Sequence, residues 1–224
     1  AYNGCKMVRG DGQPIGKGSG MEAIRDRVMA GEMPVIGTGT TTERDPREPY
    51  RAALARLVSA NDIGTCHVVI DAGNGMANAT LPTVQEYAPS LAITPLYFAF
   101  DGTFPHHEAN PLAEETLQDV QKAVVEHGAQ FGVAYDGDAD RIGVVDERGE
   151  IVPAPIVLCL IAKMLLQLHP GARILADIRC GRIVKETVEA LGGTFGITPV
   201  GHAFIKKQLR EEGAVLAGEL SSHF

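Results

Sequence analysis

The chain has 224 residues, enough for one large domain or two small ones, and its 45% hydrophobic and 21% charged residues are ordinary for a globular protein. This composition excludes a disordered chain and a fibrous repeat. The formal charge of −8 gives little attraction for phosphate backbones and no local basic patch offsets it, so we expect small polar ligands and no nucleic-acid partner.

Apolar runs rich in β-branched residues alternate with helical patterns, which predicts an α/β fold of small successive domains with mixed, mostly parallel sheets. In chain order we expect helix 21–33, helix 50–61, strand 66–71, a helix from just beyond residue 75 to 87, strand 91–98, helix 112–127, strand 131–135, strand 142–145, helix 156–168, strand 173–177, helix 183–191, strand 194–199, helix 204–212 and strand 214–217.

Two breaks divide this series. Residues 35–42, with Pro46 and Pro49 after them, read as a linker, and Arg148-Gly149 supplies a turn signal. We therefore predict three parts: 1–48 as the end of a first domain, 49–150 as a complete α/β domain, and 151–224 as a truncated one. Because the chain starts at Ala1 and stops at Phe224, we expect both ends to be incomplete.

The cysteines and the apolar segments predict a location. The four cysteines are widely spaced and form no Cys-x-x-Cys pair, which argues against a zinc knot and a dense disulfide framework. The most apolar stretch, 156–168, is short for a membrane span and contains Lys163 and Gln167, so we expect it to be a buried helix. No charged-then-apolar leader opens the chain. We expect a cytoplasmic protein with no membrane partner.

The most specific motif is Asp136-Gly-Asp138-Ala-Asp140-Arg141, which lies between two predicted strands. Alternate residues of an extended chain point the same way, so the three carboxylates are expected to converge on one cation. Crowded carboxylates repel one another unless a cation or Arg141 relieves them. Hard oxygen ligands suit Mg²⁺ or Ca²⁺ and not Zn²⁺.

This motif resembles the metal-binding loop of the α-D-phosphohexomutase superfamily, of the phosphomannomutase/phosphoglucomutase type, in which three aspartates and a phosphorylated serine hold Mg²⁺. Further resemblances follow in order along nearly the whole chain. They are Tyr-Asn-Gly-Cys-Lys at 2–6, Asp-Ala-Gly-Asn-Gly at 71–75, Asp-Gly-Thr-Phe-Pro-His at 101–106, Gly-His-Ala-Phe-Ile-Lys at 201–206, and Glu-Leu-Ser-Ser-His at 219–223. The last is similar to the family's sugar-recognition loop, Gly-Glu-x-Ser-Gly-His, with Ser222 in place of the glycine.

The resemblance implies a role for each matched residue. Asp136, Asp138 and Asp140 would bind Mg²⁺. Lys6, His223 and Arg179 would be catalytic, and Lys6 would need a lowered pKa to act near neutrality. The residues expected to bind substrate are Glu219, Ser221, His223, Gly201, His202 and Arg141.

The implied activity interconverts hexose 1-phosphates and 6-phosphates through a phosphoserine upstream of Tyr2 and a hexose 1,6-bisphosphate intermediate. Leu220 favours mannose or glucose phosphate, because glucosamine-phosphate enzymes tend to carry glutamine there. Two alternatives stay open: a phosphoglucosamine mutase, or a non-catalytic fragment that binds metal or sugar phosphate. We expect the chain alone to be inactive, since the serine and a fourth domain are missing; the oligomeric state is left open.

Overall fold

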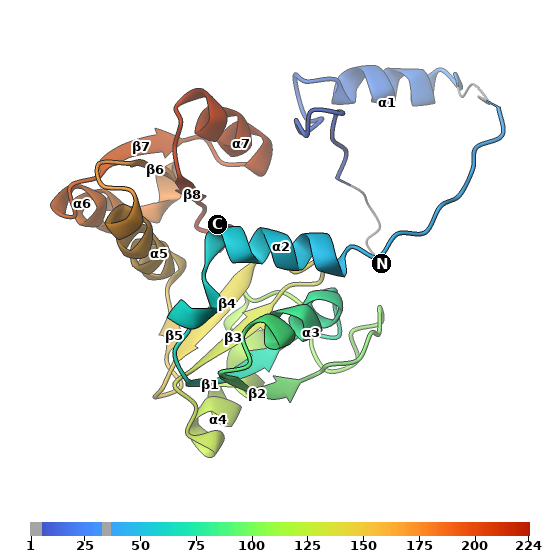
Figure 1. Ribbon diagram of the computed structural model, residues 1–224. Helices are drawn as coiled ribbons and strands as arrows, with labels where there is room; N and C mark the ends of the chain where they lie inside the picture. The colour runs from blue at the N-terminus through green and yellow to red at the C-terminus, as the bar shows by residue number, and fades with distance from the viewer. Residues whose placement is uncertain (1–5, 33–36) are drawn as a thin grey trace.

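The structure is a computed structural model that describes residues 6–32 and 37–224 (Figure 1). Residues 2–5 of the first motif and 35–36 of the predicted linker lie outside these ranges. Helix α1 (Met21–Met29) ends before the predicted residue 33, and residues 37–46 form no regular element, as a linker requires.

A five-stranded sheet forms the centre of the first α/β unit, in the order β2-β1-β3-β4-β5. Its elements are α2 (Arg47–Leu57), η1 (Ala60–Asp62), β1 (Cys66–Asp71), α3 (Ala77–Tyr87), β2 (Leu91–Leu96), η2 (Glu114–Leu117), α4 (Gln118–His127), β3 (Phe131–Tyr135), β4 (Ile142–Asp146) and β5 (Ile151–Val152). Strand β1 is parallel to β2 and β3, whereas β4 is antiparallel to β3 and β5. The loops that follow β1, β2 and β3 therefore meet at one edge of the sheet.

Strand β1 is buried on both faces, as a central strand between two helical layers must be. Val68 and Ile70 pack with Leu81 of α3, while Val69 on the opposite face packs with Val120 and its neighbours on α4. The alternation of side chains along the strand thus places α3 and α4 on opposite faces of the sheet.

The second unit repeats this plan with three parallel strands in the order β7-β6-β8, matching β2-β1-β3 (Figure 1). Its elements are α5 (Ala154–Leu168), β6 (Arg173–Asp177), η3 (Ile178–Cys180), α6 (Arg182–Ala190), β7 (Thr194–Thr198), α7 (His202–Glu211) and β8 (Leu216–Gly218). Ile174 and Ala176 pack with α5 and α6, whereas Leu175 packs with Ile205 of α7. Central strand β6 ends at Asp177, and the side chain of this residue contacts the loop that follows β8.

Besides shifts of a few residues at the ends of several elements, three sequence predictions need correction. The helix predicted over 112–127 begins as the 3₁₀ turn η2 and becomes α-helical only at Gln118. Strand β8 starts at Leu216 and not at 214, because the Ala214 amide donates to the Leu209 carbonyl and closes the end of α7. Helix α5 is not buried all round.

Helix α5 covers the core with one face only. Leu158 and Ala162 are fully buried, but Leu160 and Leu168 are each 61% exposed. Within the described ranges, no helix combines the length and apolarity that a bilayer span needs.

Candidate active site

The acidic motif forms the loop between β3 and β4, and its conformation differs from the prediction. Residues 136–140 make a tight turn with Ala139 in the left-handed region at φ +61°, so the segment is not extended. The three carboxylates still converge, because one oxygen of each of Asp136, Asp138 and Asp140 lies within 4.8 Å of the others. A tight turn, and not the alternation of an extended strand, thus brings the three carboxylates together.

Asp136 is fully buried and organises this turn. Its Oδ1 accepts from the amides of Asp140 and Arg141, at 3.0 and 3.1 Å, and its Oδ2 accepts from Arg141 Nε at 2.7 Å. These bonds satisfy a carboxylate that would otherwise be costly to bury. Arg141 therefore acts first on the acidic loop itself.

The turn that follows β1 packs against the backbone of the acidic loop. The Met76 amide donates to the Gly137 carbonyl at 3.0 Å. A β-carbon at Gly75 would stand 2.7 Å from that same carbonyl oxygen, so the turn at the end of β1 needs glycine there. Phe104, from the 101–106 motif, lies against Gly137 on another side.

Lys6 places its ammonium on the other two carboxylates. Lys6 Nζ donates to Asp138 Oδ2 at 2.8 Å and also to Asp140 Oδ2. Partial burial opposes the lysine's charge, but the two carboxylates outweigh it and raise the pKa of Lys6. The same ammonium lowers the pKa of Asp138. In this arrangement Lys6 is a proton donor or a fixed charge, and not a base.

The predicted sugar loop follows β8 as a second tight turn. The Glu219 amide donates to the His223 carbonyl at 2.9 Å, and the Ser222 amide to the Glu219 carbonyl at 3.0 Å. Ser222 takes the left-handed conformation, at φ +61°. The buried Glu219 carboxylate accepts from the Gly201 amide at 2.9 Å and from Ser221 Oγ at 3.0 Å.

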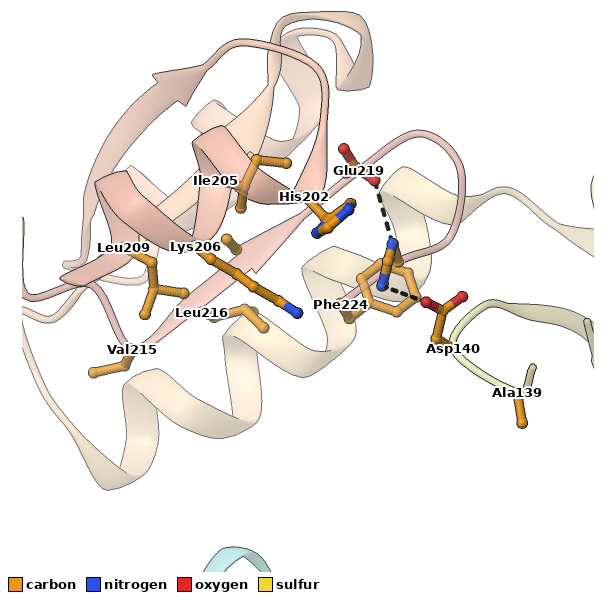
Figure 2. A pocket seen from close by; sticks show the side chains of 12 residues that line it. Ala139, Asp140, His202, Ile205, Lys206, Leu209, Val215, Leu216, Glu219 and Phe224 are labelled. Carbon is orange, nitrogen blue, oxygen red and sulfur yellow. Dashed lines mark ion pairs between the residues drawn. The ribbon is translucent and has the colours of Figure 1, made fainter. Parts of the chain in front are cut away.

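His223 joins the two loops. Its Nε2 lies 3.2 Å from Asp140 Oδ2 and its Nδ1 lies 3.4 Å from Glu219 Oε2, so the ring stands between the two carboxylates (Figure 2). A backbone bond of 3.2 Å from the Ile142 amide to the Ser222 carbonyl ties the same loop to the start of β4. The structure therefore brings the predicted metal ligands and the predicted sugar loop into one site.

A cavity of about 450 Å³ opens beside this junction. Asp140, His202, Lys206 and His223 form part of its wall, and apolar side chains of α7 and β8 form much of the rest (Figure 2). His202 lies 6.3 Å from His223 between ring centroids, and its buried Nδ1 has no hydrogen-bond partner in the described part of the chain. Burial, with Lys206 nearby, lowers the pKa of His202 and favours a neutral ring.

Comparison with known proteins assigns this arrangement to a family. Residues 48–149 match the phosphoglucomutase/phosphomannomutase α/β/α domain II, and residues 155–224 match domain III of the same family. The chain belongs to the phosphoglucomutase/phosphomannomutase family. It is thus a member of the α-D-phosphohexomutase superfamily that its motifs resemble.

Individual members of the family align over almost all of the chain. The phosphomannomutase of Salmonella typhimurium is 35% identical over 99% of the chain and 50% of its own length. The phosphomannomutase/phosphoglucomutase of Pseudomonas aeruginosa is 35% identical over 99% of the chain and 47% of its own length. The chain therefore spans about half the length of the curated relatives that it matches.

A solved structure supports the phosphohexomutase fold. The crystal structure of a phosphoglucomutase/phosphomannomutase family protein from Burkholderia thailandensis superposes with a TM-score of 0.80 at 33% identity, over 92% of this chain and 44% of that one. The predicted α/β fold with mostly parallel sheets is confirmed.

The family's motifs do not all meet directly. Among the described residues, the Arg179 guanidinium hydrogen-bonds with Asp177 and reaches neither the acidic loop nor His223. Asp177 was not predicted as a site residue, although an aspartate ending a buried strand beside Arg179 was a usable signal. Lys206 in the cavity wall was also missed, because a lysine in a helix is usually at the surface.

Proposed function

We propose that the protein is a Mg²⁺-dependent phosphohexomutase that interconverts hexose 1-phosphates and 6-phosphates, most favourably those of mannose or glucose. The observation that carries this proposal is the bridge made by His223 between Asp140 of the acidic loop and Glu219 of the sugar loop. The bridge would hold the proposed sugar loop next to carboxylates that suit a cation, and the cation would in turn attract the phosphoryl group.

The donor set of the acidic loop fits Mg²⁺. Asp136, Asp138 and Asp140 supply hard oxygen donors, with one oxygen of each within 4.8 Å of the others. The Lys6 ammonium also lies on Asp138 and Asp140, which supports a preference of this loop for positive charge. When bound, Mg²⁺ would neutralise charge on the phosphoryl group as it moves.

The chain's own residues would supply positioning and proton transfer. By resemblance, a serine upstream of Tyr2 carries the phosphoryl group, and a sugar hydroxyl attacks its phosphorus as the serine O–P bond breaks. By the same resemblance, His223 would take the proton from that hydroxyl, and the charged Lys6 would donate one to the departing serine oxygen. The reverse sequence at the other sugar oxygen would return a phosphoryl group to the serine through a hexose 1,6-bisphosphate.

The sugar loop would recognise the ring. Glu219 and His223 can accept from and donate to neighbouring hydroxyls, and Ser221 adds a hydroxyl that serves both functions. Arg179, linked to the loop through Asp177, and His202, near His223, would contact phosphate or hydroxyl oxygens. Leu220 is apolar and offers no partner for an amino group, in line with mannose or glucose in place of glucosamine.

The experiment follows ³¹P NMR spectra of mannose 1-phosphate, glucose 1-phosphate and glucosamine 1-phosphate, each with the whole protein, Mg²⁺ and catalytic hexose 1,6-bisphosphate. We expect 6-phosphate resonances for mannose and glucose and their loss when the metal is chelated. Turnover of glucosamine phosphate alone would reassign the substrate. Binding of all three sugars without turnover would instead identify a non-catalytic sugar-phosphate binder.

A further inference from the structure

Asp177 is a buried carboxylate at the end of the central strand of the second sheet. It is 2% exposed, so its charge needs close partners. Because β6 and β8 are parallel neighbours, with Ala176 opposite Gly218, the chain leaving β6 and the chain leaving β8 emerge side by side. Asp177 therefore stands between the segment that carries Arg179 and the segment that carries the sugar loop.

Its two oxygens hold both segments at once. On the β6 side, Oδ1 accepts from the Arg179 amide at 2.7 Å and Oδ2 accepts from Arg179 Nη2 at 2.6 Å, with Nε 3.2 Å from each oxygen. On the β8 side, Oδ2 accepts from the Leu220 amide at 3.0 Å. One carboxylate thus joins a guanidinium to the backbone that immediately follows Glu219.

We propose that Asp177 is a positioning residue that sets where Arg179 stands relative to the sugar loop. This inference rests on the proposed function, because it assigns the loop to a sugar ring and Arg179 to an oxyanion of the same ligand. Asp177 itself touches no ligand in this account. It acts through Arg179 and through the Leu220 amide.

The geometry of the guanidinium shows what this link achieves. Arginine binds a carboxylate through two parallel N–H groups, and Nε with Nη2 already face Asp177. In the described ranges no hydrogen bond uses Nη1, and the side chain is 42% exposed. The free edge of the fork is therefore held in one orientation, with its donors available for an anionic oxygen.

Charge supports the same assignment. Burial opposes ionisation of Asp177, but its bonds from Arg179 and Leu220 outweigh burial and lower the pKa of its carboxyl. The acceptor therefore stays charged at neutral pH and accepts from four N–H groups. An amide at this position would place N–H groups against some of those donors, so an Asp177→Asn change disrupts the link with little change in volume.

The chain offers a matched control in Asp71, which ends central strand β1 in the first sheet. It is 1% exposed, accepts from the Gly73 amide at 2.8 Å, and pairs with His107 Nε2 at 2.9 Å. Asp71→Asn therefore removes a comparable buried charge without touching Arg179 or Leu220. Any general loss of stability should appear in both variants.

The first arm of the test uses NMR hydrogen exchange on the ligand-free chain. In the wild type and in Asp71→Asn we expect protected Leu220 amide and Arg179 Nε–H resonances, and in Asp177→Asn we expect both to exchange freely. If Asp177→Asn does not fold, hydrogen exchange in the wild type alone still tests the proposal. Exchange of its Arg179 Nε–H as fast as that of the exposed Arg51 would overturn the proposal.

The second arm measures mannose 1-phosphate binding by calorimetry in the presence of Mg²⁺. We expect Asp177→Asn to weaken it roughly 10- to 100-fold, the usual cost of losing a group that orients a ligand contact, and Asp71→Asn to change it by less than about threefold. Equal affinities in the two variants would refute the positioning role. Absence of binding by the wild type would instead count against the proposed function, while hydrogen exchange would still decide the link.

Discussion

Removing the Lys6 ammonium should make the acidic loop bind Mg²⁺ more tightly. Lys6 Nζ lies 2.8 Å from Asp138 Oδ2 and also bonds with Asp140, so a metal ion that binds these carboxylates must displace it. The side chains of Lys6 and Asp138 are 51% and 56% exposed, and solvent screening limits such an ion pair to at most about 1 kcal/mol. Because about 1.4 kcal/mol corresponds to tenfold in affinity, Lys6→Met should lower the Mg²⁺ dissociation constant by up to about fivefold.

Isothermal titration calorimetry with MgCl₂ measures this change directly. Lys17→Met is the matched control, because it removes the same charge from an exposed position of the same segment, beside a pocket that the acidic loop does not line, and should leave the dissociation constant within about twofold. The reasoning fails if Lys6→Met binds Mg²⁺ as weakly as the wild type or more weakly. Such a result would mean that Lys6 supports the metal site and does not compete for it.

Three further changes test separate features. Ser222→Gly should raise the free energy of unfolding by up to about 1 kcal/mol in urea titrations, because glycine accepts φ +61° freely, and unchanged or lower stability would contradict the strain assigned there. Glu219→Gln keeps an oxygen for the Gly201 amide, so the free energy of unfolding should change by less than about 1 kcal/mol. The affinity for mannose 1-phosphate should nevertheless fall about tenfold, and an unchanged affinity would leave the loop a purely structural role. Burial opposes the charge of His107, but the Glu108 carbonyl and the Asp71 carboxylate outweigh burial and raise the pKa of the ring. The stabilisation from this charge is therefore fully present below about pH 6.5 and is lost as pH rises through the raised pKa. Amide hydrogen exchange of residues 101–110, corrected for its intrinsic pH dependence, should therefore become faster over this pH range in the wild type but not in His107→Gln. Parallel pH profiles in the two proteins would show that the charge of His107 does not stabilise this loop.

Several elements could be predicted closely from the sequence. Strands β1, β3 and β6 have the predicted bounds, because each is a short apolar run that ends where polar or turn-forming residues begin. The two-layered helical cover follows from the same runs, since strands that are apolar on both faces need a helix on each side. Motifs of the site could be predicted for a similar reason, because the acidic motif directly follows β3 and the sugar loop directly follows β8.

The conformation of the loops could not be predicted. Ala139 and Ser222 both take left-handed backbone angles that their residue types do not signal, and each helps to bring its loop's side chains together. The pairing of Asp177 with Leu220 joins positions 43 apart in sequence, which only the parallel pairing of β6 with β8 brings close. The exposed stripe of α5 was marked only by Lys163 and Gln167, because the same stripe also carries Leu160 and Leu168, whose apolar side chains gave no sign of exposure.

The central claim is that the acidic loop and the sugar loop form one site, and ³¹P relaxation tests it most directly. Mn²⁺ occupies oxygen-ligand sites of the Mg²⁺ type and broadens nearby nuclei. With mannose 1-phosphate bound, Mn²⁺ should broaden the ³¹P resonance strongly in the wild type and far less in Asp138→Asn, which loses one of the three carboxylates. A bound sugar phosphate whose ³¹P resonance stays sharp with Mn²⁺ in the wild type would show that the metal and the sugar occupy separate sites.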